Sequence, residues 1–110
     1  MRKSKYHSRR VEVAGEKFDS QAECSRWNQL MRMQIAGRIT GLLRQVSFEL
    51  APAAVVAGKK KRALTYRADF MYIDEHGNTI VEDKKGVLTE AYKIKRHLMK
   101  AIHNIDILET

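Results

Sequence analysis

Two apolar segments joined by a short turn constrain the fold of this chain most strongly. The first reads "ALTYRADFMYID", the second reads "TIVEDKKG", and the residues between them, "EHGN", are typical of a hairpin turn. We therefore predict two neighbouring antiparallel strands. The second strand ends in two acids, two lysines and a glycine, a pattern that suits either a solvated strand end or a site that binds a metal ion and a phosphate.

The remaining segments predict one mixed sheet covered by helices. A capping signal at Asp19 or Ser20 and a closing Gly37 bound a first helix of about 16 residues. A strand ending at Pro52, the hairpin, an amphipathic helix capped by Thr89 and a short strand "IDIL" follow it. The order α-β-β-β-α-β predicts an α/β (α+β) fold with a mixed central sheet flanked by helices. The expected apolar stripe of the first helix is Trp27, Leu30, Met31 and Ile35.

Three shorter segments complete the chain. Residues 11–20, "VEVAGEKFDS", predict a small hairpin that turns at Ala14 and Gly15, and residues 53–62, "AAVVAGKKKR", predict a positively charged loop or ragged strand extension. Residues 1–10 have no periodicity, so we expect a disordered basic arm. With 110 residues in all, residues 11–110 are expected to form one domain.

The sequence carries no signal for membrane insertion or export. No apolar run approaches the roughly 20 residues that cross a bilayer, and the basic N-terminus lacks the apolar segment of a signal peptide. We therefore expect a cytoplasmic protein without membrane contacts. The single cysteine, Cys24, cannot form an internal disulfide and is expected to be a buried or helix-surface thiol.

The charge distribution favours a nucleic-acid partner. The formal net charge is +8 and the isoelectric point is near 9.8. Lysine and arginine that neutralise phosphates release counterions, so such a chain should bind nucleic acid in a salt-dependent manner. The basic residues form three clusters, which are Arg2, Lys3, Lys5, Arg9 and Arg10; Lys59, Lys60, Lys61 and Arg62; and Lys93, Lys95, Arg96 and Lys100.

The end of the second hairpin strand offers two acid and lysine pairs. Metal-dependent cleavage of a phosphodiester needs carboxylates that hold the ion and commonly a lysine that orients water or stabilises charge on the phosphate. Residues two apart on a strand point the same way and lie about 7 Å apart. Glu82 with Lys84 and Asp83 with Lys85 both satisfy this spacing, and the period of the strand does not choose between them.

Two further acids can join either pair. Asp69 interrupts the apolar first strand of the hairpin between Ala68 and Phe70, where antiparallel pairing brings it near residues 82–85. Glu23 lies on the same helical face as Trp27. Glu23 also completes a capping box with Ser20, so it is a candidate for the site, for the cap or for both.

These acids, together with "FDSQAE", "YRADFMY", "VEDKKG" and "TEAYKIK", resemble the PD-(D/E)XK nuclease superfamily. More narrowly, they are similar to a family of small phage proteins in that superfamily, akin to Holliday-junction resolvases. The resemblance runs from about Phe18 to the end of the chain. It implies a restriction-endonuclease-like core, a Mg²⁺ cofactor with Mn²⁺ as an alternative, and a homodimer that acts on branched DNA.

Carried over residue by residue, the resemblance assigns the site. Glu23 is the helix acid, Asp69 is the first acid of the motif, and Asp83 with Lys85 is the remainder. The family pattern has an apolar residue where this chain has Lys84, which leaves the frame of Glu82 and Lys84 open. The carried-over metal ligands are Asp69, Asp83 and Glu23, and Lys95 on the second helix is a candidate phosphate contact. The expected DNA-binding residues are Arg9, Arg10, Lys59, Lys60, Lys61, Arg62 and Lys95.

We therefore expect a Mg²⁺-dependent endodeoxyribonuclease that cuts branched DNA such as a Holliday junction. Two alternatives remain at this point. One is a basic nucleic-acid-binding protein without catalysis, in which the acids balance the lysines. The other is a PD-(D/E)XK nuclease whose substrate is another DNA structure.

Overall fold

The computed structural model describes residues 11–13, 16–18, 20–84 and 88–110. The predicted arm of residues 1–10 and the predicted turn at residues 14 and 15 lie outside this part of the chain. The elements are, in order, β1 (Val11–Val13), β2 (Glu16–Phe18), α1 (Gln21–Ile35), β3 (Thr40–Ala51), β4 (Ala54–Val56), β5 (Lys59–Lys61), β6 (Leu64–Ile73), β7 (Thr79–Asp83), α2 (Glu90–His103) and β8 (Leu108–Glu109).

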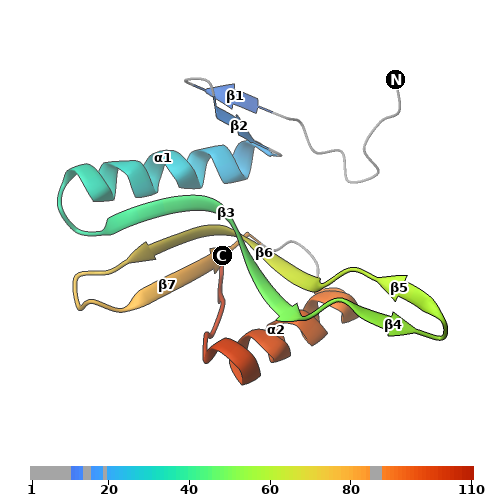
Figure 1. The fold of residues 1–110 in the computed structure, drawn as a ribbon. Helices are drawn as coiled ribbons and strands as arrows, with labels where there is room; N and C mark the ends of the chain where they lie inside the picture. Colours follow the sequence, from blue (N-terminus) through green and yellow to red (C-terminus); the bar gives the residue numbers. More distant parts are fainter. Residues whose placement is uncertain (1–10, 14–15, 19, 85–87) are drawn as a thin grey trace.

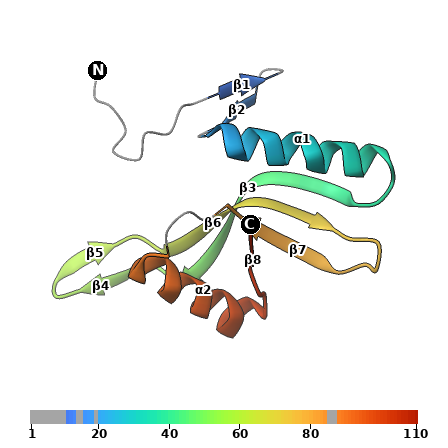
Figure 2. The same ribbon diagram turned by 180° about the vertical axis from the view of Figure 1, so that it is seen from behind.

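The central sheet has four strands in the order β3-β6-β7-β8. β3 pairs antiparallel with β6, β6 pairs antiparallel with β7, and β7 pairs parallel with β8. Figures 1 and 2 show α1 on one side of this sheet and α2 on the other. The predicted α/β (α+β) fold with a mixed sheet flanked by helices is thus confirmed.

Local sequence signals begin and end the helices. The Ser20 hydroxyl accepts a hydrogen bond from the Glu23 amide at 3.1 Å and caps α1, while Thr89 caps α2 in the same way through the Tyr92 amide. α1 ends at the cap residue Ala36, after which Gly37 adopts a φ of 77° that L side chains rarely adopt. α2 ends at Asn104, also in the left-handed region.

The core has two clusters, one beneath each helix. The cluster on the α1 side contains Leu30, Ile39, Leu42, Phe70 and Tyr72. The cluster on the α2 side contains Leu50, Tyr66, Ala68, Val81, Tyr92 and Met99. The predicted stripe of α1 is wrong at its end, because Ile35 is the last helical residue and its side chain is 82% exposed.

β6 changes the face that its side chains present. Strict alternation along a strand would put residues 66, 68, 70 and 72 on one face. Tyr66 and Ala68 instead join the α2 cluster, whereas Phe70 and Tyr72 join the α1 cluster. The change occurs at Asp69, so this residue lies where the two layers of the core meet.

The neighbouring strand departs from regular strand geometry at the same level. β3 pairs Arg44 with Phe70 and Val46 with Ala68, which sets Gln45 beside Asp69. Gln45 has a φ of 55°, a left-handed conformation in the middle of an extended strand.

Residues 53–62, for which the sequence predicted a loop or a ragged strand extension, contain a second hairpin. β4 and β5 pair antiparallel in a two-stranded sheet of their own. The turn residues Ala57 and Gly58 have φ angles of 51° and 78°. Two positive φ angles are typical of the type I′ turn, whose twist matches the twist of a two-stranded ribbon.

Candidate functional site

Asp69 and Asp83 lie side by side where β6 and β7 meet the end of the sheet. β6 pairs Phe70 with Glu82, and the same register continued by one residue sets Asp69 opposite Asp83. Asp83 acts on Asp69 through hydrogen bonding and charge, and both effects raise the pKa of Asp69. The backbone amide of Lys84 also donates a hydrogen bond to Asp69 Oδ2 at 2.8 Å. The hairpin register thus brings together two acids that are 14 residues apart in the sequence.

The surroundings of Asp69 oppose its ionisation. Burial, the hydrogen bond shared with Asp83 and the negative charges of Asp83 and Glu23 raise the pKa of Asp69 to about 7, against an opposing effect of the Lys84 amide. A carboxyl group in this position holds a proton near neutral pH unless another cation replaces it. Perturbation of this kind, by burial and by like charges, is characteristic of functional sites.

Tyr66 fixes the second acid from the α2 side. Its hydroxyl donates a hydrogen bond to Asp83 Oδ2 at 2.6 Å, and Asp83 is only 4% exposed. Burial and this hydrogen bond raise the pKa of the Tyr66 phenol well above its usual value of 10, so the group stays a donor at neutral pH. Tyr66 therefore holds one oxygen of Asp83 in place.

Glu23 reaches the same region from the first turn of α1. Its carboxylate accepts hydrogen bonds from Gln45 Nε2 at 2.8 Å and from Arg44 Nη2 at 3.1 Å. Glu23 is 4% exposed, and its negative charge acts on Asp69. The backbone amide of Glu23 donates a hydrogen bond to the Ser20 hydroxyl, whereas its carboxylate is bound by side chains of β3. Gln45, the residue with positive φ, thus connects Glu23 to the point where β6 changes face.

Glu82 belongs to a different network on the α1 side. Arg26 donates two hydrogen bonds to it, from Nε to Oε1 at 2.8 Å and from Nη2 to Oε2 at 2.7 Å. The Tyr72 hydroxyl donates a third to Oε2, and Glu82 has no exposed surface. Of the two frames left open by the sequence, the structure therefore sets Asp83 beside Asp69 and directs Glu82 towards α1.

The other predicted site residues occupy different positions. Lys85, Arg9 and Arg10 lie outside the described residues, and the side chain of Lys84 is exposed. Lys59, Lys60 and Lys61 form β5, and with Arg62 they are exposed to solvent. Lys95 is half-buried on α2. The structure thus brings together Glu23, Asp69 and Asp83, and it separates them from Glu82.

Sequence reasoning missed the partners that hold these acids. Tyr66, Arg44 and Gln45 contact Asp83 and Glu23 across the sheet, and Arg26 contacts Glu82 over a separation of 56 residues. A signal existed only for Arg26, which follows Glu23 by three residues and hence lies near its helical face. The contact of Tyr66 with Asp83 follows the change of face in β6, which no sequence period encodes, and the contacts of Arg44 and Gln45 with Glu23 join β3 to α1.

The donor set suits a hard divalent cation held by two carboxylates. Within the part of the chain that the structure describes, no three His, Cys, Asp or Glu side chains form a group that could hold a metal ion. Arg44 and Gln45 bind the carboxylate of Glu23. Mg²⁺ commonly takes only one or two carboxylates and completes its shell with water and substrate phosphate. Asp69 and Asp83 fit this mode of binding.

No helix of the described residues is long and apolar enough to cross a membrane.

Comparisons with known proteins place the chain in one family. Searches of curated proteins and of solved structures find no match to the chain. The family model described as "Protein of unknown function (DUF1064)" matches residues 3–107, and the chain therefore belongs to this family.

Proposed function

We propose that this protein is a metal-dependent DNA endonuclease of the PD-(D/E)XK type, and that its substrate is branched DNA. The observation that supports the proposal most is the position of Asp69 opposite Asp83 on adjacent antiparallel strands, where Asp83 raises the pKa of Asp69. Two acids forced together in a partly buried position are unfavourable unless a proton or a metal ion compensates their charge. The α-β-β-β-α-β core presents them between a sheet end and an acidic residue of the first helix.

In this proposal Asp69 and Asp83 hold Mg²⁺ or Mn²⁺. The bound ion would supply a Lewis acid for the phosphate and a water of lowered pKa. Tyr66 keeps Asp83 oriented, and the Lys84 amide does the same for Asp69. Glu23, fixed by Arg44 and Gln45, adds negative potential and can bind the ion through water. Lys85, which follows the acidic pair in the sequence, positions the attacking water, as the family resemblance implies.

The basic residues supply the contacts with the DNA backbone. Lysine and arginine side chains position a duplex through its phosphates without reading its sequence, which suits an enzyme that selects DNA by structure. The contact residues proposed are Arg9, Arg10, Lys59, Lys60, Lys61, Arg62 and Lys95. Resolution of a junction needs two cuts, so the proposal includes a homodimer, and a phage origin with action in the host cytoplasm is consistent with it.

A cleavage assay with matched variants tests the proposal. The wild type, Asp69→Asn and Asp83→Asn are incubated with a four-way junction, a flap and a linear duplex, with Mg²⁺, with Mn²⁺ or with EDTA. We expect metal-dependent cleavage of the junction by the wild type. Each asparagine variant should lose more than about 100-fold in rate, because loss of a ligand exceeds the roughly 10–100-fold effect of losing a ligand's hydrogen-bond partner.

The control is Asp106→Asn, the same chemical change at an exposed residue that pairs with Lys100. Its cleavage rate should equal that of the wild type, and circular dichroism should show all three variants folded. Binding of Mn²⁺, followed by electron paramagnetic resonance, gives a readout that does not depend on cleavage. DNA binding without cleavage by the wild type would refute the nuclease proposal and support the non-catalytic alternative. Preferred cleavage of the flap would show that the substrate is a DNA structure other than a junction.

A further inference from the structure

The hairpin of β4 and β5 stands apart from the rest of the fold. It forms its own two-stranded sheet, and Figures 1 and 2 show it projecting from the end of β3 and β6 beyond the central sheet. Its apolar side chains are open to solvent, with Val55 66% exposed and Val56 53% exposed. A ribbon that leaves valines uncovered and extends from the domain is available for a partner.

The charge of this hairpin is positive on both of its faces. Residues paired across a two-stranded ribbon share a face, and successive pairs alternate between faces. Val55 pairs with Lys60 on one face, whereas Val56 pairs with Lys59 and Ala54 pairs with Lys61 on the other. No acid occurs from residue 50 to residue 68, so nothing in this segment of the sequence offsets the lysines.

We propose that this hairpin enters a groove of duplex DNA about one helical turn from the phosphate that is cut. The inference rests on the proposed nuclease function for the position of that phosphate. The major groove admits a two-stranded ribbon, and phosphates line both of its walls. Lysines on both faces can therefore contact both walls. A ribbon lying flat on one backbone would use the lysines of only one face.

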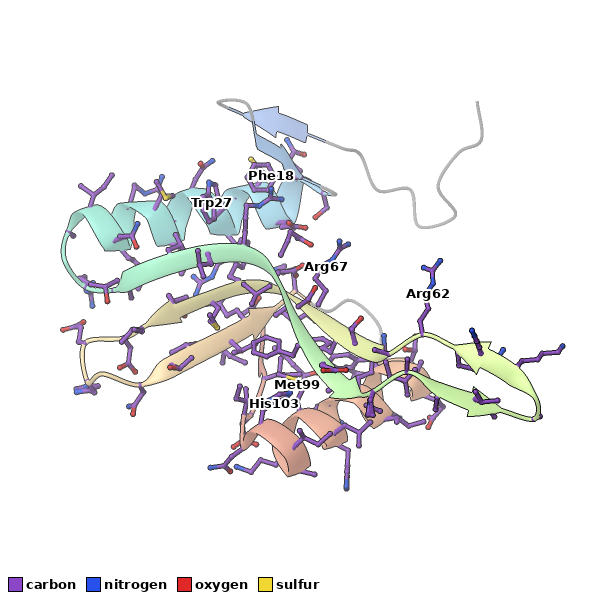
Figure 3. All side chains as sticks on the ribbon, in the orientation of Figure 1. Phe18, Trp27, Arg62, Arg67, Met99 and His103 are labelled. Atoms are coloured by element: carbon purple, nitrogen blue, oxygen red, sulfur yellow. The ribbon has the colours of Figure 1, made fainter. Side chains whose placement is uncertain are left out.

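The number of residues between Asp69 and the hairpin agrees with the proposed separation between the cleaved phosphate and the groove that the hairpin enters. Lys60 precedes Asp69 by nine residues. At about 3.3 Å per extended residue, these residues span at most roughly 30 Å, which is within the 34–36 Å of one turn of DNA. Arg67 and Arg62 lie between them, and in Figure 3 both point away from the side of the sheet that α2 covers. These arginines continue the positive charge from the site to the hairpin.

A binding assay without metal tests the hairpin separately from catalysis. Fluorescence anisotropy in EDTA measures the affinity for a labelled duplex of 30 base pairs over a range of salt concentrations. Each lost phosphate contact lowers the slope of log K against log salt by about 0.9. We expect Lys59→Ala and Lys60→Ala each to lower the slope by about 0.9, which corresponds to one lost phosphate contact. The double variant should lower it by about twice that amount.

The matched control is Arg32→Ala with Arg38→Ala, two exposed cations outside the three basic clusters. Each double variant reduces the net charge of +8 by two, to +6. The control should keep the slope of the wild type to within half a contact. An equal loss in the control, or an effect of only one of the two hairpin lysines, would overturn insertion into a groove.

Cleavage in Mg²⁺ then tests the distance. Junctions whose arms are shortened from 20 to 6 base pairs should lose at least tenfold in kcat/KM with the wild type, with the loss beginning near 10 base pairs. The Lys59→Ala/Lys60→Ala variant should show less than a twofold dependence on arm length. If the wild type cleaves the junction but the hairpin variants bind DNA like the wild type, only the hairpin inference is refuted. If the hairpin variants bind DNA more weakly but the wild type does not cleave it, only the nuclease proposal is refuted.

Discussion

Replacement of Arg26 by methionine should strongly destabilise the fold. Arg26 gives Glu82 two short hydrogen bonds, 2.8 and 2.7 Å long, and Glu82 has no exposed surface. The Arg26→Met variant keeps most of the aliphatic volume of the side chain but removes its charge. Among the described residues, Glu82 would then keep the hydrogen bond from the Tyr72 hydroxyl but lose both bonds from Arg26.

The size of the effect follows from this geometry. Removing one partner of a buried ion pair costs about 3–5 kcal/mol, because the other charge is left uncompensated. Near 110 residues, 1 kcal/mol shifts the thermal midpoint by about 4 °C, so a decrease of roughly 12–20 °C is expected. Replacing all three polar groups by apolar ones, Arg26→Met/Glu82→Leu/Tyr72→Phe, should leave stability within about 2 kcal/mol of the wild type.

Urea unfolding measures these free energies. Trp27 is the only tryptophan and lies 6.1 Å from Phe70 between ring centroids, so its fluorescence reports the docking of α1 on the sheet. Arg38→Met is the control, because it breaks an ion pair with Glu75 in which both side chains are more than half exposed. It should cost less than about 1 kcal/mol. A similar cost for both arginine variants, or a triple variant as unstable as Arg26→Met, would refute the reasoning.

Two further predictions concern the site itself. In metal-free buffer, Asp69 with its pKa of about 7 keeps a proton in the folded protein that the unfolded chain, with a value near 3.8, releases. The stability of the wild type relative to Asp69→Asn should therefore fall as pH rises from about 4 to 7 and then level off. Thermal midpoints of the two proteins measure this, and a constant difference over that range would contradict it. At position 45, where φ is positive, glycine should be more stable than alanine by about 1 kcal/mol, since both variants lose the hydrogen bond to Glu23. Equal urea midpoints for the two variants would show that the backbone of β3 carries no strain there.

The order of the elements could be predicted because each carries a local signal. Ser20 and Thr89 mark helix starts through side-chain chemistry that acts within three residues. The turn at residues 74–78 also sets the register between β6 and β7. The amide of Asp74 donates a hydrogen bond to the carbonyl of Asn78, and counting back from this pair puts Asp69 opposite Asp83. The hairpin of β4 and β5 escaped prediction because Ala57 takes a φ of 51°, a conformation that usually requires glycine or asparagine.

The surroundings of the acids could not be predicted for a different reason. A strand with period two would direct Tyr66 and Phe70 to the same face, yet they lie in different clusters of the core. At the same level, Gln45 of the neighbouring strand has a positive φ. The contact of Tyr66 with Asp83 joins residues of two strands, so no single segment of sequence contains the information that predicts it.

The contrast between Glu82 and Asp69 separates structural acids from the proposed functional pair. Glu82 is fully buried, but a guanidinium and a phenol compensate its charge. Asp69 faces two other acids that raise its pKa, and the backbone amide of Lys84 opposes them. An asparagine would keep that amide contact without the repulsion, so stability alone does not explain an acid at this position. The proposed binding of a divalent cation would account for an acid at this position, because it needs the negative charge that asparagine lacks.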